Sequence, residues 1–156
     1  MSDYLKFRSA LQNFARQFDR AGSMKTPCGV NISPTKAHAI MEIGTTDNEN
    51  FTQKDLALSL GLNKSNITRL VQVLEVDGFL KRVVPESDKR LFLLKLTAKG
   101  KILCKRLESS SQKYIEELLA HIPKNKHKKL IETLEDLNKA NLLIIKKKAK
   151  NEETIN

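Results

Sequence analysis

The stretch of sequence that decides the fold lies at residues 52–78 and reads TQKDLALSLGLNKSNITRLVQVLEVDG. Thr52 and Asp55 match the capping-box pattern that opens many helices, with Asp in the place of the usual Glu. The pattern therefore predicts a short helix from about residue 53 to Leu60.

A second helix is expected after a tight turn. Gly61 stands where the chain must turn, and glycine adopts positive φ at no steric cost. Asn63 is a preferred N-cap residue, and Gly78 is of the type that closes many helices in the left-handed conformation. We therefore expect this helix to begin after Asn63 and to run to Asp77. Two short helices joined in this way indicate a helix-turn-helix.

The apolar residues of both helices support this motif. When Gln53 is counted as the first position, the fifth is Ala57, where the helices cross and a small side chain is needed. The ninth is Gly61, at the turn. Five further positions must face inward, and all five are apolar: Leu56, Leu60, Leu62, Ile67 and Leu70.

A β-hairpin is predicted directly after the second helix. Residues 79–84 are β-branched and apolar enough for a strand, and residues 91–96, which are mostly apolar, are expected to form a second strand. Residues 85–90 combine Pro, Ser and Asp with charged side chains and are typical of a turn. A hairpin at this place is the wing of a winged helix-turn-helix.

Two helices are expected on the N-terminal side. Apolar side chains at helical spacing predict the first over residues 3–20. Ser33 and Pro34 open the second, because serine caps helices and proline is tolerated at the first helical position. This second helix is expected to run to about Ile43 and to end at Gly44.

On the C-terminal side, Thr97 caps a long helix, Pro123 marks a break, and a last helix ends near Lys148. Gly100 falls in the first turn of the long helix, where it costs about 1 kcal/mol relative to Ala. The last helix has a wider apolar stripe than one surface helix needs, which favours a dimer interface. The residues of this stripe are Leu130, Ile131, Leu134, Leu137, Leu142, Leu143, Ile144 and Ile145.

These elements predict a mainly α fold with a small β-hairpin wing, a winged helix-turn-helix flanked by N- and C-terminal dimerisation helices. We expect a single domain over residues 1–156. Within it, residues 33–97 form the DNA-binding lobe. The dimerisation helices cover 3–20 and 98–148, and 149–156 form a flexible tail.

The charge of the chain points to a polyanionic partner. The 156 residues carry a formal net charge of +10. Residues 1–50 contribute +1, residues 51–100 contribute +4, and residues 101–156 contribute +5. The helix-turn-helix and wing therefore lie in a basic stretch, as expected for a nucleic-acid partner.

Several protein classes are disfavoured. No apolar run approaches the roughly 20 residues of a membrane span. The N-terminus is interrupted by charges, so no signal peptide is expected. Two cysteines make no disulfide framework, which favours the cytoplasm. No phosphate-binding glycine loop, nucleophile elbow or metal-ligand spacing is evident, so we expect no enzyme, cofactor or metal site.

The second helix of the motif is the expected reading helix, which enters the major groove of double-stranded DNA with its first turns. Asn, Arg and Gln read bases there, while Lys and Ser more often contact phosphate. The expected contacts include no acid: Asn63, Lys64, Ser65, Asn66, Thr68, Arg69 and Gln72.

The wing supplies a second set of expected DNA contacts, Asp88, Lys89 and Arg90. A narrow minor groove concentrates negative potential and attracts an inserted arginine, and Arg90 is the expected residue. Asp88 is expected to accept hydrogen bonds from Arg90 and so to shape the tip.

The sequence resembles the MarR family of winged helix-turn-helix regulators. Asp88-Lys89-Arg90 matches the family's Asp-x-Arg wing, and Leu96-Thr97-Ala98-Lys99-Gly100 matches the Leu-Thr-x-x-Gly pattern after it. Residues 74–80 look like the family's Leu-Glu-x-x-Gly-Leu-Ile stretch. The resemblance covers about residues 52–104.

The resemblance implies a homodimer on a pseudo-palindromic operator, usually as a repressor. It also implies release by a small aromatic ligand, with a pocket expected between the first, second and fifth helices. Cysteine oxidation controls some members, and Cys28 lies roughly where such sensors carry a reactive cysteine, with Lys25 nearby to favour a thiolate.

Two alternatives stay open: a redox sensor that uses Cys28, and a non-specific architectural or RNA-binding protein. The second is disfavoured by the specific wing motif and by the presence of only six Phe and two Tyr, because single-strand readers need stacking platforms.

Overall fold

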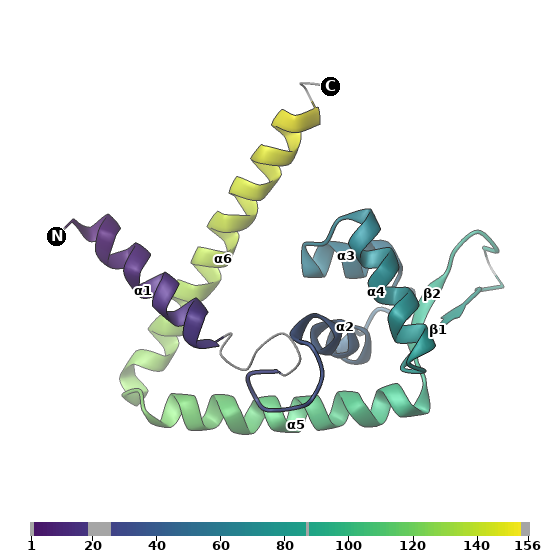
Figure 1. Cartoon of the computed structure of the whole chain (residues 1–156), viewed down its shortest axis with the longest axis horizontal. Coiled ribbons are helices and arrows are strands. Elements are labelled where there is room, and N and C mark those ends of the chain that lie inside the picture. The colour runs from purple at the N-terminus through teal and green to yellow at the C-terminus, as the bar shows by residue number, and fades with distance from the viewer. Residues whose placement is uncertain (1, 19–25, 87, 154–156) are drawn as a thin grey trace. The chain divides into compact units, whose positions relative to one another are not determined.

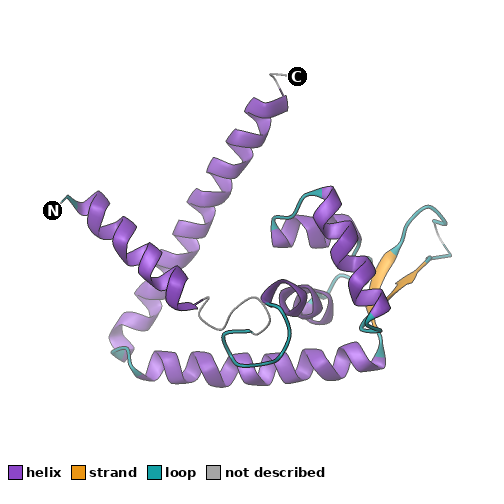
Figure 2. Ribbon diagram, viewed as in Figure 1, coloured by secondary structure: helices purple, strands orange, loops and turns teal. Residues whose placement is uncertain are grey.

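The computed structural model describes residues 2–18, 26–86 and 88–153, and within them it shows six helices and a two-stranded hairpin (Figures 1 and 2). This confirms the predicted fold class. The elements are α1 Asp3–Phe18, α2 Pro34–Thr45, α3 Gln53–Leu60, α4 Lys64–Val76, β1 Leu80–Val83, β2 Leu93–Leu96, α5 Ala98–Ala120 and α6 Lys124–Glu153.

The chain divides into two compact units, residues 1–114 and 115–156. The first holds α1 to β2 and most of α5, and the second holds the end of α5 and α6. In the second unit, His127 Nε2 lies within hydrogen-bond distance of the Ile122 carbonyl oxygen, at 2.8 Å. This contact stabilises the turn between α5 and α6. The expectation of a single domain stays a prediction.

The capping box before α3 forms as predicted. The Thr52 amide donates to Asp55 Oδ2 at 2.8 Å, and the Asp55 amide donates to Thr52 Oγ1 at 3.3 Å. The Thr52 hydroxyl and amide hydrogen bonds lower the pKa of the Asp55 carboxyl. The start of α3 is thus held by a reciprocal pair of side chain–backbone bonds.

The turn and the α4 cap also follow the sequence. Gly61 ends α3 with φ of 62°, in the left-handed region. Asn63 Oδ1 accepts from the Asn66 amide at 2.9 Å and so caps α4. Gly78 follows α4 with φ of 76°, as expected for a helix-closing glycine.

The strands are shorter than predicted. Pairing runs from Leu80↔Leu96 to Val83↔Leu93, so the predicted limits of 79–84 and 91–96 are wrong at the tip. Side chains of Val84 and Phe92 are exposed, and without a core to cover they extend no ladder. On its other edge β2 is held by the loop before α3, because the Leu94 amide donates to the Phe51 carbonyl at 2.8 Å.

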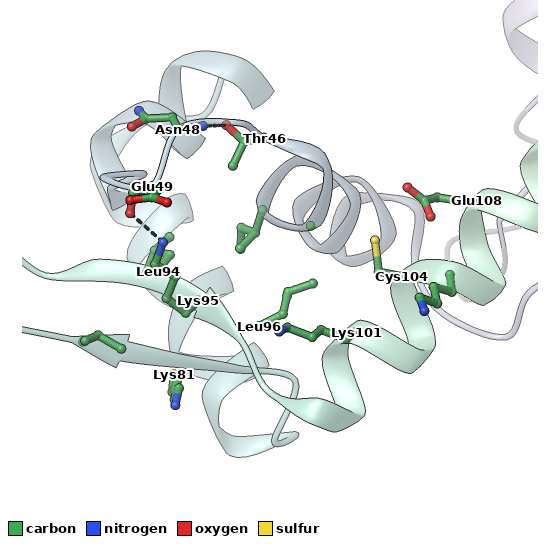
Figure 3. Close-up of a pocket in the computed structure, with 14 residues that line it drawn as sticks. Thr46, Asn48, Glu49, Lys81, Leu94, Lys95, Leu96, Lys101, Cys104 and Glu108 are labelled. Carbon is green, nitrogen blue, oxygen red and sulfur yellow. Dashed lines mark hydrogen bonds between the residues drawn. The ribbon is translucent and has the colours of Figure 1, made fainter.

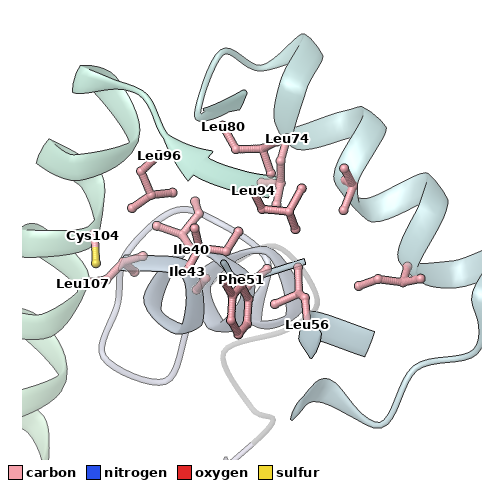
Figure 4. Packing of buried hydrophobic residues seen from close by; sticks show 14 of the residues in the cluster. Ile40, Ile43, Phe51, Leu56, Leu74, Leu80, Leu94, Leu96, Cys104 and Leu107 are labelled. Atoms are coloured by element: carbon pink, nitrogen blue, oxygen red, sulfur yellow. The ribbon is translucent and has the colours of Figure 1, made fainter. Parts of the chain in front are cut away.

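The hydrophobic core lies where α2, α3, α4, both strands and α5 meet (Figure 4). Its fully buried side chains include Ile40, Leu56, Leu74, Leu94 and Leu107. Each such side chain contributes about 1.5–3 kcal/mol relative to exposure. Because the core contains Ile67, Val71 and Leu74 of α4, it fixes which face of that helix turns outward.

Gly44 does not end α2, which continues to Thr45, so this predicted helix end is wrong. A Cβ at Gly44 would lie 2.5 Å from the Cys104 sulfur. Glycine is therefore present for close packing of α2 on α5. The sequence could not show this, because the partner lies 60 positions away.

The last helix does not end where the sequence predicts. Helix α6 continues to Glu153, so the expected tail at 149–156 is helical over its first five residues. Residues 154–156 lie outside the described residues, as do residues 19 and 20 of the predicted first helix.

Candidate nucleic-acid interface

Helix α4 has one buried face and one polar face. Ile67, Val71 and Leu74 are at most 2% exposed and define the buried face, against which Leu70 also packs. Six of the seven predicted reading residues are exposed: Asn63, Lys64, Ser65, Asn66, Arg69 and Gln72. None is acidic, and the polar face lies at the N-terminal half of the helix, where the helix dipole also favours a phosphate.

Thr68 differs from the other six, because its hydroxyl is already used inside the protein. The side chain is half-buried, and its Oγ1 donates to the Lys64 carbonyl at 2.7 Å and accepts from Gln53 Nε2 at 3.0 Å. Thr68 and Gln53 therefore brace α3 against α4. Sequence reasoning missed Gln53, because an exposed-looking polar residue at a helix start carries no signal of a partner 15 positions away.

The wing tip carries Asp88, Lys89 and Arg90, all exposed. Asp88 Oδ1 accepts from the Arg90 backbone amide at 2.9 Å, and the Asp88 carbonyl accepts from the Leu91 amide at 3.2 Å. Asp88 thus shapes the tip through the backbone of Arg90 rather than through its guanidinium. Among the described residues, the Arg90 guanidinium has no ion pair and is left for another partner.

Two ion pairs tie the C-terminal end of α4 to its neighbours. Arg82 in β1 pairs with Glu75 at 3.2 Å, and Lys36 in α2 pairs with Asp77 at 2.9 Å. Lys99 Nζ donates to the Asp77 carbonyl at 2.7 Å. These contacts, which sequence reasoning did not predict, fix α4 relative to the wing, α2 and α5.

A cleft of about 550 Å³ is lined by Lys36 and Asp77, at the start of α2 and along α5. Its apolar lining includes Ile32, Phe79 and Leu103, and Lys36 and Arg106 add positive charge. The cleft touches α2 and α5 as expected for a ligand pocket, but no described residue of α1 lines it.

Cys28 is half-buried, with its sulfur 3.0 Å from the Thr26 hydroxyl oxygen. Lys25, the expected source of thiolate stabilisation, lies outside the described residues. Cys104 is buried in the core, and burial raises the pKa of its thiol. The described residues contain no cluster of three or more His, Cys, Asp or Glu placed to hold a metal ion.

An outward polar helix, a preceding helix braced against it and an adjacent hairpin with a charged tip define a winged helix-turn-helix protein. Residues 30–91 match the model of the MarR family. This segment is about two fifths of the chain, and over it the chain is similar to the MarR family.

Among curated proteins, the HTH-type transcriptional regulator PrsX of Escherichia coli is 25% identical over 101 residues. This match covers 60% of the chain and 61% of PrsX, so the chain spans about three fifths of the length of such relatives. Among solved structures, Streptococcus pneumoniae FabT in complex with DNA has a TM-score of 0.72 at 19% identity, covering 91% of this chain and 99% of FabT. The S. aureus MepR–DNA complex has a TM-score of 0.69 at 17% identity, covering 90% and 98%. At these identities the structures show the shared fold alone.

None of the helices in the described ranges is both long and apolar enough to cross a membrane.

Proposed function

We propose that the chain is a sequence-specific regulator of transcription that binds double-stranded DNA in the cytoplasm, as a homodimeric repressor on a pseudo-palindromic operator. One observation carries this proposal: the exposed, acid-free face of α4 lies next to a wing whose tip arginine, Arg90, has no ion pair among the described residues. The DNA complexes of the structural relatives FabT and MepR agree with it.

The contacts divide by chemistry. Asn66, Arg69 and Gln72 are assigned to base edges in the major groove, because amide and guanidinium groups bond them bidentately. Lys64 and Ser65, in the first turn of α4, are assigned to phosphates. Arg90 is assigned to the minor groove beside this site.

Sequence-specific binding is tested by competition. Genomic fragments selected on the protein, with the chain's own upstream region included, are expected to resist displacement by random duplex. Affinity is expected to fall steeply with salt, because each neutralised phosphate releases counterions, with a slope of about −0.9 per phosphate contact in a log–log plot. Equal displacement by random duplex would instead identify a non-specific architectural protein.

A homodimer is supported by two unburied apolar faces. Phe7 and Phe14 of α1 are 55% and 54% exposed, and no residue of α1 is buried within the chain. In α6, no described side chain is buried, although the exposed ones include Ile131, Leu134, Leu142, Leu143, Ile144 and Ile145. Exposed apolar faces of this extent are typical of interaction surfaces.

Sedimentation at micromolar concentration is therefore expected to give twice the mass of the 17.7 kDa chain. A twofold axis would place two copies of α4 about one DNA turn, roughly 34–36 Å, apart. A monomeric mass would contradict the proposed dimer, and the operator would then need only one half-site.

Release from DNA by a small aromatic ligand is part of the proposal, with the cleft beside Lys36 and Asp77 as its site. A ligand with an acidic group would compete with Asp77 for Lys36, and would thereby weaken a contact that holds the end of α4. The relative MepR has been solved with ethidium bromide bound, at a TM-score of 0.53.

The alternative control by oxidation uses Cys28. If it operates, peroxide treatment lowers the DNA affinity of the wild-type protein but not that of Cys28→Ser. Serine keeps the hydrogen bond to Thr26 available, so the substitution tests the sulfur itself. Equal responses of the two proteins to peroxide would exclude Cys28 as the sensor.

A further inference from the structure

A second cleft, of about 570 Å³, lies between the C-terminal end of α2, the loop before α3, the wing strands and α5 (Figure 3). Part of its lining is apolar, with Ile43, Leu96 and Cys104. This volume is within the range of ligand pockets, which are commonly about 300–1,000 Å³. The cleft can therefore hold the apolar body of a small molecule.

Four lysines line the same cleft in two unfavourable pairs. Lys81 and Lys95 are directly opposite in the β1–β2 register, and like charges in such positions repel. Lys101 and Lys105 are four residues apart on α5, where like charges also destabilise. Two repulsive pairs from different elements thus converge on one cavity.

The two acids of the cleft make no direct ion pair with these lysines. Glu49 and Glu108 line it, but no ion pair between described residues joins either of them to any of the four lysines. Lys95 donates to the backbone carbonyl of Glu49 rather than to its carboxylate. The lining therefore keeps a formal net charge of +2 from four lysines and two glutamates.

We propose that this cleft binds a small organic anion, with a carboxylate or phosphate group held by the lysines and an apolar body on the Ile43–Leu96 side. The site is distinct from the cleft beside Lys36. Lys101 and Lys105 lie on one face of α5, whereas Ile102 and Arg106, which line the other cleft, are each about 100° further round the helix.

The test is a fluorescence titration of the full chain with 1-naphthoate and 1-naphthyl phosphate, with neutral 1-naphthamide for comparison. Both anions are expected to bind, and a preference between them identifies the head group. Lys101→Ala/Lys105→Ala is expected to bind the preferred anion at least about tenfold more weakly, because two charged contacts are lost. Both lysines are exposed and repel one another, so the variant is expected to unfold at the wild-type temperature or slightly above it.

Two control variants test where on α5 the anion binds. Lys113→Ala removes an exposed lysine of the same helix that does not line the cleft, and is expected to bind as the wild type does. Arg106→Ala alters the other cleft, which is proposed to take an acidic aromatic ligand, so this variant shows how much of the titration belongs to that cleft. Three results would overturn the proposal. Anion binding could be lost in Arg106→Ala and in no other variant, it could be unchanged in the double variant, or naphthamide could bind as tightly as the anions. Weaker duplex binding by the double variant, with naphthoate binding intact, would instead assign these lysines to the DNA backbone.

Discussion

Gly100→Ala is expected to lower the free energy of unfolding by about 2 kcal/mol, although alanine is the better helix former. Gly100 lies in the first turn of α5 and is buried. A Cβ built there overlaps the carbonyl oxygen of Phe79 and lies 3.3 Å from Leu96 Cβ. Helix propensity alone predicts that alanine stabilises by about 1 kcal/mol.

Packing outweighs propensity here because the neighbouring group is backbone. The Phe79 carbonyl already accepts the Thr97 amide at 3.0 Å, and the Thr97 hydroxyl donates to the Gly78 carbonyl at 2.7 Å. These bonds prevent the junction between α4 and β1 from moving aside. Overpacking of this kind costs about 3 kcal/mol at the upper end of its usual range, which leaves about 2 kcal/mol after the propensity gain.

The measurement is urea unfolding followed by circular dichroism. Gly44→Ala serves as the comparison, because its nearest obstacle is the Cys104 thiol, a side chain that can rotate away. A smaller loss is expected there. If Gly100→Ala proved as stable as the wild type or more so, the close approach to Phe79 would not be limiting.

Most of the fold could be predicted from local signals in the sequence. The capping box at Thr52, the positive φ of Gly61 and the Asn63 cap each depend on residues within a few positions, and all three formed as predicted. The same holds for the order of the helices and the hairpin, because the apolar periodicity of each segment is local too.

The errors occurred where a distant partner decides the structure. Gly44 looked like a helix end, but it is a contact with Cys104 in α5. Thr68 looked like a surface residue, but it bonds with Gln53 in α3. Both pairings depend on how the helices pack, which no short window of sequence contains.

Only those parts of the candidate site that depend on local sequence could be predicted. The outward face of α4 follows from helical periodicity, so six of the seven predicted residues are exposed there. Neither the Arg82–Glu75 nor the Lys36–Asp77 pair is evident in sequence, because each joins separate elements. The two clefts likewise arise only when α2, α5 and the wing come together.

Arg90→Ala is expected to weaken binding of the proposed operator by roughly 5- to 150-fold, corresponding to about 1–3 kcal/mol. Arg90 is exposed at the wing tip, and its guanidinium has no ion pair with a described residue. The substitution keeps the backbone amide that bonds Asp88 Oδ1, so the turn is expected to survive. A loss of affinity in this variant therefore reports the guanidinium contact rather than a collapsed wing.

The matched control is Arg82→Ala, which removes an arginine of the same hairpin whose guanidinium is already paired with Glu75. Its effect on operator affinity is expected to be smaller, because loss of this guanidinium acts only through the position of α4 and removes no DNA contact. Affinities of both variants are measured by fluorescence anisotropy at several salt concentrations. A minor-groove contact is expected to reduce the salt slope by about one unit in Arg90→Ala, since one phosphate-proximal cation is lost. Unchanged affinity in Arg90→Ala would show that the wing does not contact DNA through this residue, and would leave recognition to α4 alone.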